Sequence, residues 1–297
     1  MRRAEWKGLR NAASTGRSHG GEIRDYMLPY HGEGLSNDTR GTRGGKNTSK
    51  IISNIAGFAI RTLASGLHGG LTSPARPWLR LGFENRELEE SEDHRRYLFE
   101  LAEVILGICA RSNVYSALHA LYQEIPGFGT GALFIDDDDE QYAFAQTLTV
   151  GEYELAAGKN NKIDTLWRKL WMSSRQMVDA FGEDRVSQNV LNAYRRSDET
   201  TLFPVLHVTR PRQSWGNDSP LPEMFAYESF YFEETGTVTK FLREGGYRVC
   251  PFMAPRWDII GTDIYGRSPG MLVLPDVKQL QRMESDKLLG LAKIVNP

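Results

Sequence analysis

Residues 41–46, Gly-Thr-Arg-Gly-Gly-Lys, have the composition of a phosphate-binding loop ahead of a helix. The nucleotide-binding motif also needs a glycine five positions before its second glycine, and a Ser or Thr after the lysine to reach magnesium. Arg40 and Asn47 occupy those two positions, and no strand pattern precedes the loop. We therefore interpret residues 41–46 as a flexible basic loop.

A second glycine run, Gly127, Gly129 and Gly131, has partial dinucleotide-binding spacing. That motif requires a strand before the glycines and a helix after them. Here a helical pattern precedes the run and a strand pattern follows it. The glycines are expected to turn the chain sharply from helix to sheet.

Asp136, Asp137, Asp138 and Asp139 could ligate a hard cation, because carboxylates suit calcium or magnesium. Their spacing is not that of an EF-hand, and neighbouring strand residues point to opposite faces. We favour a solvated hairpin tip.

The histidines are scattered and none forms a metal pair at helical spacing. The six are His19, His31, His68, His94, His119 and His207.

The two cysteines, Cys109 and Cys250, lie far apart, which excludes a disulfide scaffold and a zinc finger. Cys109 lies in an apolar helical pattern and is expected to be a small core residue rather than a nucleophile. The tryptophans Trp167, Trp171, Trp215 and Trp257 are expected in the core or an interface. No catalytic, cofactor-binding or metal-ligating residue is assigned, and we expect no enzyme and no cofactor.

The composition limits the class of protein that this chain can be. The chain has 297 residues, 40% hydrophobic and 25% charged, which is ordinary globular usage. The net charge of −2 excludes a protein that coats DNA through bulk positive charge. No apolar run approaches the roughly 20 residues that cross a bilayer, and no signal peptide is recognised. We expect a soluble protein made in the cytosol, without membrane contact.

Residues 1–50 carry 10 Lys and Arg against five acids, many glycines and few apolar residues. This pattern predicts an extended arm with short helical pieces, either a flexible terminus or an arm that orders against a neighbouring subunit. A helix capped by Thr48 and Ser49 is predicted over residues 51–67. A long helix starts in the acidic stretch 84–103, with Leu98, Val104 and other apolar residues as its buried stripe.

The middle of the chain favours strands. A break at residues 112–113 precedes a helix that ends at residues 126–127, and a hairpin over residues 131–146 follows. Strands are predicted over 148–150, 152–155, 163–170, 202–208, 226–232, 238–242 and 247–249, with a short helix at 175–181 that Ser173 or Ser174 caps. A last helix, capped by Asp276, ends the chain. The fold class is α+β, with long helices and an antiparallel β region.

Several short blocks, in this order, carry a resemblance to a known family. They are residues 64–67 (ASGL), 70–74 (GLTSP), 77–81 (PWLRL), 112–115 (SNVY), 128–131 (FGTG), 151–154 (GEYE), 177–182 (MVDAFG), 205–208 (VLHV), 246–247 (GY), 251–252 (PF), 256–257 (RW) and 265–270 (YGRSPG). The chain resembles the portal, or head-to-tail connecting, proteins of T7-like short-tailed bacteriophages over about residues 22–297. Family members continue well past the last residue of this chain, so it is expected to be a truncated product, a fragment or the well-ordered portion of a longer protein.

The resemblance implies the portal-protein fold and a ring-forming subunit, usually a dodecamer, at one capsid vertex of the virion. Such rings seed procapsid assembly with capsid and scaffolding proteins and dock the terminase large subunit. They pass double-stranded DNA through an axial channel in genome packaging and ejection, and they later hold a tail adaptor protein. The protein would be made in the cytoplasm of a host bacterium. The resemblance also implies that ATP hydrolysis belongs to the packaging motor, a separate protein, and that the portal is structural.

The domain division that we expect is a basic, partly flexible arm (1–50), a wing-like α/β body (51–225), and strands and a helix toward the stem and clip (226–297). A closed ring needs two different complementary faces on each subunit. One hypothesis pairs the acidic stretch 84–103 with Arg40, Arg43 and Lys46 of a neighbour; in the alternative, both stretches are merely solvated. Two other functions stay open: a nucleotide- or nucleic-acid-processing enzyme that uses Lys46 and the acidic tip, and a prophage remnant that no longer assembles.

Overall fold

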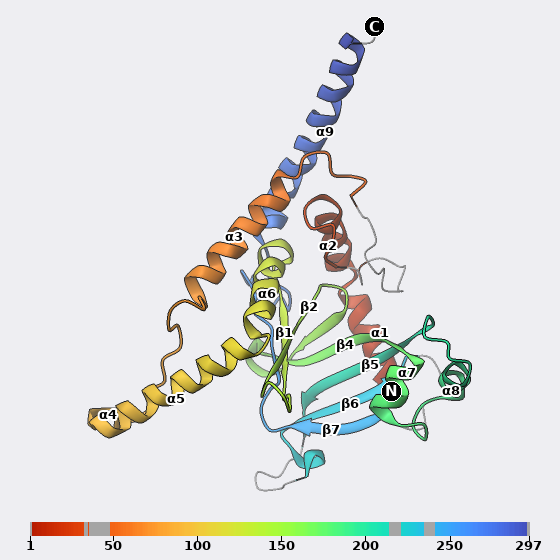
Figure 1. Ribbon diagram of the computed structural model, residues 1–297. Coiled ribbons are helices and arrows are strands. Elements are labelled where there is room, and N and C mark those ends of the chain that lie inside the picture. The colour runs from red at the N-terminus through yellow and green to blue at the C-terminus, as the bar shows by residue number, and fades with distance from the viewer. Residues whose placement is uncertain (1, 33–34, 36–47, 214–220, 235–240, 296–297) are drawn as a thin grey trace.

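Two antiparallel sheets form the β part of an α+β fold, which confirms the predicted fold class (Figure 1). This computed structural model describes residues 2–32, 35, 48–213, 221–234 and 241–295. The larger sheet is a five-stranded meander in which each strand pairs with the next along the chain. Its strands are β3 (Tyr153–Ala157), β4 (Ile163–Ser173), β5 (Leu202–Pro211), β6 (Tyr227–Glu233) and β7 (Arg243–Tyr247).

The smaller sheet has the order β2-β1-β8 and contains the predicted hairpin. β1 (Ala132–Asp136) and β2 (Phe144–Leu148) pair antiparallel, and β8 (Phe252–Met253) returns to the free edge of β1. The side chain of Asn113 supplies Ala145 with a backbone-like partner: it donates to the Ala145 carbonyl (2.7 Å) and accepts from the Ala145 amide (2.8 Å). This anchor fixes the outer strand to the start of the neighbouring helix.

The N-terminal segment contains the predicted helical pieces, but residues 2–26 fold onto the body of the same chain, so the prediction that they form an extended arm was wrong. α1 (Arg2–Ala12) and α2 (Ser14–Tyr26) lie against the body of the same chain. Trp6 is 2% exposed and packs against Trp167 of the large sheet, with ring centroids 6.2 Å apart. Ile23 and Met27 are buried in one cluster with Leu274 of the last helix. A few large apolar residues therefore anchor a segment whose average composition is polar.

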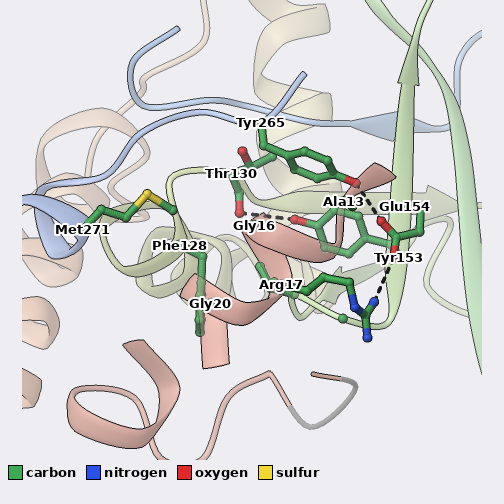
Figure 2. A pocket seen from close by; sticks show the side chains of 12 residues that line it. Ala13, Gly16, Arg17, Gly20, Phe128, Thr130, Tyr153, Glu154, Tyr265 and Met271 are labelled. Carbon is green, nitrogen blue, oxygen red and sulfur yellow. Dashed lines mark hydrogen bonds and ion pairs between the residues drawn. The ribbon is translucent and has the colours of Figure 1, made fainter. Parts of the chain in front are cut away.

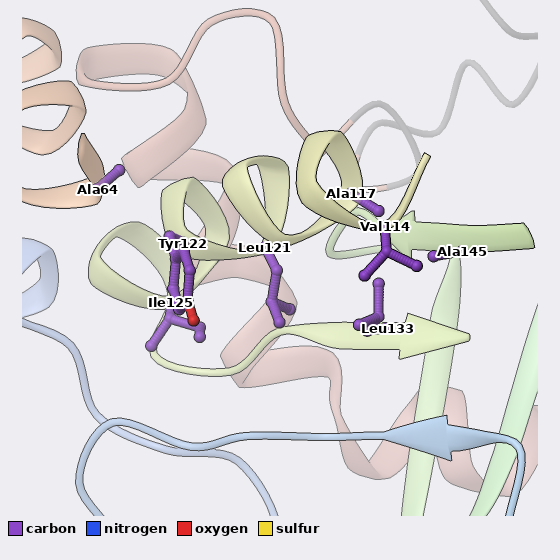
Figure 3. Close-up of a cluster of buried hydrophobic side chains, with 8 residues drawn as sticks. All are labelled: Ala64, Val114, Ala117, Leu121, Tyr122, Ile125, Leu133 and Ala145. Atoms are coloured by element: carbon purple, nitrogen blue, oxygen red, sulfur yellow. The ribbon is translucent and has the colours of Figure 1, made fainter. Parts of the chain in front are cut away.

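The next helix, α3, begins at Ile55 and ends at Leu71, so the predicted cap at Thr48 and Ser49 lies several residues too early. A helix α6 (Val114–Phe128) packs across it. Figure 3 shows the cluster between them and the small sheet, with side chains from α3, α6, β1 and β2. Its members are Ala64, Val114, Ala117, Leu121, Tyr122, Ile125, Leu133 and Ala145. Pro126 lies inside α6, and the helix ends at Gly129 rather than at residues 126–127.

The predicted acidic stretch lies on two helices, α4 (Arg86–Glu90) and α5 (Glu92–Arg111). The chain bends by 77° between α5 and α6, at residues 112–113. The predicted buried stripe of α5 is largely uncovered in one subunit. Val104 is 56% exposed, and of the helix only Ala102 is buried. Figure 1 shows α5 leading outward from the sheets to α4. The apolar stripe predicted from the sequence is present on α5, but the described part of the chain leaves it largely uncovered.

At the far side of the large sheet, α7 (Ser174–Phe181) starts as predicted, with Ser173 and Gln176 forming a capping box. A further helix that was not predicted, α8 (Gln188–Arg195), packs beside α7. Two short 3₁₀ helices cover residues Lys159–Asn161 and Pro222–Met224. The strand predicted over 238–242 falls mostly outside the described residues, and β7 lies between the two predicted strands.

The last helix, α9 (Pro269–Val295), starts before Asp276, where we predicted its cap. Ser268 begins it instead: its Oγ accepts from the Met271 amide (2.9 Å) and donates to the Gly127 carbonyl (2.7 Å). At 27 residues the helix is about 40 Å long. Only its first half packs on the body, and the rest projects away from it (Figure 1). Part of the predicted seam is thus exposed, Leu288 and Leu291 among it.

Candidate functional site

In the described part of the chain, the residues for which the sequence suggested a chemical role do not lie together in one site. The loop 41–46 and Trp215 lie outside the described residues. Asp137 and Asp139 are exposed at the hairpin tip, where Asp138 accepts from the Gln141 amide at 2.9 Å. Among the residues that the structure describes, no three His, Cys, Asp or Glu side chains form a metal-binding group. The acidic tip is a solvated turn, as predicted.

The glycines at 127–131 turn the chain from α6 into β1, as predicted from the sequence. Gly129 has φ +81°, which favours glycine, and ends α6. A Cβ on Gly129 would lie 2.2 Å from the carbonyl oxygen of Gly266. The Trp257 amide also donates to the Gly129 carbonyl at 2.9 Å. The turn therefore joins α6 and β1 to the segment that leads into α9.

Cys109 packs against the cluster of Figure 3, and burial raises the pKa of its thiol. Cys109 is only partly buried, and its packing agrees with the prediction of a small residue against the core; a raised pKa disfavours the thiolate form. Trp167 is fully buried between Trp6 and Phe232, as expected for a core tryptophan. Trp257, in contrast, is 42% exposed.

A buried polar group that the sequence analysis missed joins the two sheets. Arg168 on β4 donates from Nε to Nδ1 of His207 on β5 at 2.7 Å, and from Nη1 to Gln146 on β2 at 3.2 Å. Its guanidinium lies over the Phe134 ring of β1, 4.1 Å from the centroid. Burial, and then the charges of Arg168 and Arg243, hold the pKa of His207 well below its usual range. The group is structural, since it lies inside the fold.

A second group ties three distant segments together at a pocket (Figure 2). The carboxylate of Glu154 on β3 accepts from Nη1 of Arg17 on α2 at 2.8 Å and from the Tyr265 hydroxyl at 2.9 Å. Burial raises the pKa of Glu154, and Arg17 opposes that shift. Beside it, the Tyr153 hydroxyl donates to the Thr130 carbonyl at 3.2 Å. Because these polar groups bond to one another, the surface that they leave in the pocket is mainly apolar.

Two further buried polar side chains, Glu124 and Gln281, connect distant segments near α3 and α6. Glu124 on α6 is 2% exposed and binds Nδ1 of His31 at 2.7 Å and the Thr149 hydroxyl at 2.8 Å. Gln281 on α9 accepts from the amides of Ile52 and Ser53 at 2.7 and 2.8 Å. These contacts bind the N-terminal helices, α3, α6 and the first half of α9 into one body.

From that body, α3, α5 and the second half of α9 expose apolar side chains. The most exposed include Phe58 on α3, Tyr97 and Phe99 on α5, and Ile294 on α9. Exposed apolar surface on this scale marks sites of contact with other macromolecules. No single helix of the described chain is long and apolar enough to span a membrane; α5 and α6 pass that test only as a bent pair, and α6 is largely buried. The candidate functional site is therefore this set of projecting helices.

Comparison with known proteins places the chain in a family. The model of the bacteriophage head to tail connecting proteins matches residues 2–297, and the chain belongs to that family. This agrees with the resemblance seen in the sequence blocks.

Two curated relatives within this similarity are named as portal proteins. The chain is 37% identical over 294 residues to a probable portal protein of Bordetella phage BPP-1, covering 99% of this chain and 53% of that protein. It is 32% identical over 290 residues to the portal protein of Salmonella phage epsilon15, covering 97% of this chain and 52% of that protein. The chain thus spans about half the length of the curated relatives that it matches.

Proposed function

We propose that this protein is a phage portal protein, a subunit of a closed ring at one vertex of the capsid. The observation that carries the proposal is the match of residues 2–297 to the head-to-tail connecting family, with two relatives named as portal proteins. The projecting helices support it, because a ring subunit must keep apolar surface for its neighbours. In the virion the protein would lie at the junction of head and tail.

The proposed ring conducts double-stranded DNA during packaging and ejection, and it binds the terminase large subunit, a tail adaptor, and capsid and scaffolding proteins. The net charge of −2 suits a conduit. Many basic contacts to phosphate would release counterions and hold the DNA in place. The role is structural and needs no catalysis, cofactor or metal. No observation favours the alternative of a nucleotide-processing enzyme.

Parts of the chain take different roles in this proposal. Residues 51–225 form the wing-like body, and residues 226–297 lead toward the stem and clip, with the projecting half of α9 as the stem helix. That half carries both signs of charge; Arg282 and Asp286, for example, pair at 3.0 Å. The boundary at residue 50 does not separate packing units, because Ile23 and Leu274 share one cluster.

The proposal is tested in infected cells by interrupting this gene in a phage that carries it. We expect capsids without DNA and without tails, and rescue of both by the intact chain supplied in trans. Normal yields of filled, tailed particles from the interrupted phage would contradict the proposal. A variant that removes Lys46 should package normally, whereas the enzyme alternative requires that lysine.

A further inference from the structure

The charge of the chain changes sign at one point between α3 and α5. Residues 39–83 contain no Asp or Glu, and residues 84–103 carry eight acids against three arginines. The bases of the first stretch are Arg40, Arg43, Lys46, Lys50, Arg61, Arg76 and Arg80. Here the acid-free face means α3 together with residues 72–80, all of which belong to the described part of that stretch. The acidic arm means residues 84–103 on α4 and α5.

The acidic arm presents uncompensated carboxylates. Glu87, Glu90 and Glu103 are exposed. Within the described residues none of the three forms an ion pair, whereas Glu100 pairs with Arg96 at 2.9 Å. The same arm exposes two aromatic rings, Tyr97 at 60% and Phe99 at 61%. It therefore offers both charge and apolar area to a partner.

The acid-free face offers the complement. Arg61, Arg76 and Arg80 are exposed, and none contacts a carboxylate among the described residues; Arg76 binds the Gly69 carbonyl at 2.9 Å. Phe58 and Ile55 are exposed on the same helix. The two surfaces are thus alike in apolar content and opposite in charge.

The two surfaces do not satisfy each other inside one subunit, because no ion pair joins them in the described chain. Both belong to helices at the edge of the fold remote from α7 and α8 (Figure 1). A cyclic assembly joins two different faces of neighbouring copies. We propose that the acidic arm of one copy docks on the acid-free face of the next. This inference rests on the proposed ring.

In this interface the two kinds of contact have different roles. Exposed ion pairs are individually weak, so burial of the aromatic and aliphatic side chains supplies most of the affinity. The opposite charges orient the copies and exclude head-to-head contact, which would place like charges together. Assembly is therefore expected to slow as salt is raised.

A charge-swap experiment tests the pairing. The arm variant carries Glu87→Lys, Glu90→Lys and Glu103→Lys, and the face variant carries Arg61→Glu, Arg76→Glu and Arg80→Glu in the full chain. Matched control variants reverse exposed charges on the opposite side of the large sheet, at residues 183–184 and 195–196. The fraction of chain in rings is measured by native mass spectrometry, and thermal melting reports folding.

Each swapped variant alone places like charges at every interface, so its ring fraction should fall about tenfold or more. Mixing the two variants makes both kinds of junction attractive and should restore rings of alternating subunits, as should one chain with all six changes. The controls should assemble like the original protein. Rings from either swapped variant alone, or no recovery from folded mixtures, would overturn the pairing. An original chain that forms no rings would instead contradict the proposed function.

Discussion

The Nε of Arg168 lies 2.7 Å from Nδ1 of His207, and this contact sets the tautomer of a fully buried histidine. Arginine only donates, so Nδ1 must accept and Nε2 carries the proton toward the Ser229 hydroxyl at 2.8 Å. The ring of Tyr231 stacks on the imidazole with centroids 4.0 Å apart. His207 is thus held neutral between the two sheets.

The neutral His207 predicts a pH dependence of stability. Its pKa in the fold is well below the value of about 6.5 of an unfolded histidine. Below that pH the unfolded chain binds a proton that the folded chain excludes, so the contribution of His207 to stability, intact above it, is lost as the pH falls. The free energy of unfolding should decline from pH 7 to pH 5, and less steeply in His207→Gln. Equal slopes for both proteins in urea titrations would contradict this.

The ion pair between Arg17 and Glu154 predicts that a second substitution partly restores the stability that the first one removes. Arg17→Ala leaves the Glu154 carboxylate, which is 2% exposed, with the Tyr265 hydroxyl as its remaining side-chain hydrogen-bond partner among the described residues, which should cost about 3 kcal/mol. Adding Glu154→Gln removes the unpaired charge and should recover part of that loss. Urea unfolding of the single and double variants measures it. A double variant less stable than Arg17→Ala would contradict the account.

Gly129 and Gly182 allow a backbone test at two positions of positive φ. Both have φ above +80°, but a Cβ at Gly182 meets no atom within 4 Å, whereas at Gly129 it meets the Gly266 carbonyl. Gly182→Ala should cost about 1–3 kcal/mol for its backbone conformation alone, because φ 83° with ψ 155° lies in a region that is essentially restricted to glycine. Gly129→Ala should cost clearly more, because the segment before α9 must move. Similar melting temperatures for the two variants would refute the close approach.

Trp6 tests whether α1 belongs to the folded body. Its side chain is buried against Trp167, so Trp6→Ala should lower the free energy of unfolding by about 3–5 kcal/mol. The same change should red-shift the tryptophan emission as Trp167 gains contact with water. Lys7→Ala, at an exposed position of the same helix, is the control and should leave both properties nearly unchanged. An unaltered Trp6→Ala protein would restore the flexible-arm interpretation.

Local signals in the sequence predicted most of the regular structure. The Ser173 cap, the hairpin at 131–146 and the break at residues 112–113 each depend on neighbours in the chain, and each was confirmed. Helix starts were less predictable. Ser268 caps α9 through the Met271 amide, a local contact that we overlooked in favour of Asp276; its second contact, to the Gly127 carbonyl 141 positions away, has no local pattern that reveals it.

The polar groups inside the fold and the exposure of its helices could not be predicted for a related reason. Arg168 and His207 are 39 positions apart and meet only once β4 and β5 pair. The available signal was a charged residue inside an apolar strand pattern, which marks an exception without naming its partner. The apolar stripes of α5 and α9 were recognised. An amphipathic pattern shows that a face will be covered, but it does not show whether the same chain or another copy covers it.

The most direct test of the central claim is the mass of the purified protein in solution, measured by native mass spectrometry. We predict one species of about a dozen copies of the 33.6 kDa chain, closed as a ring in electron micrographs. Rings would show that this chain carries the two complementary faces that a closed assembly needs. A folded protein that stays monomeric at every concentration tested would contradict the account.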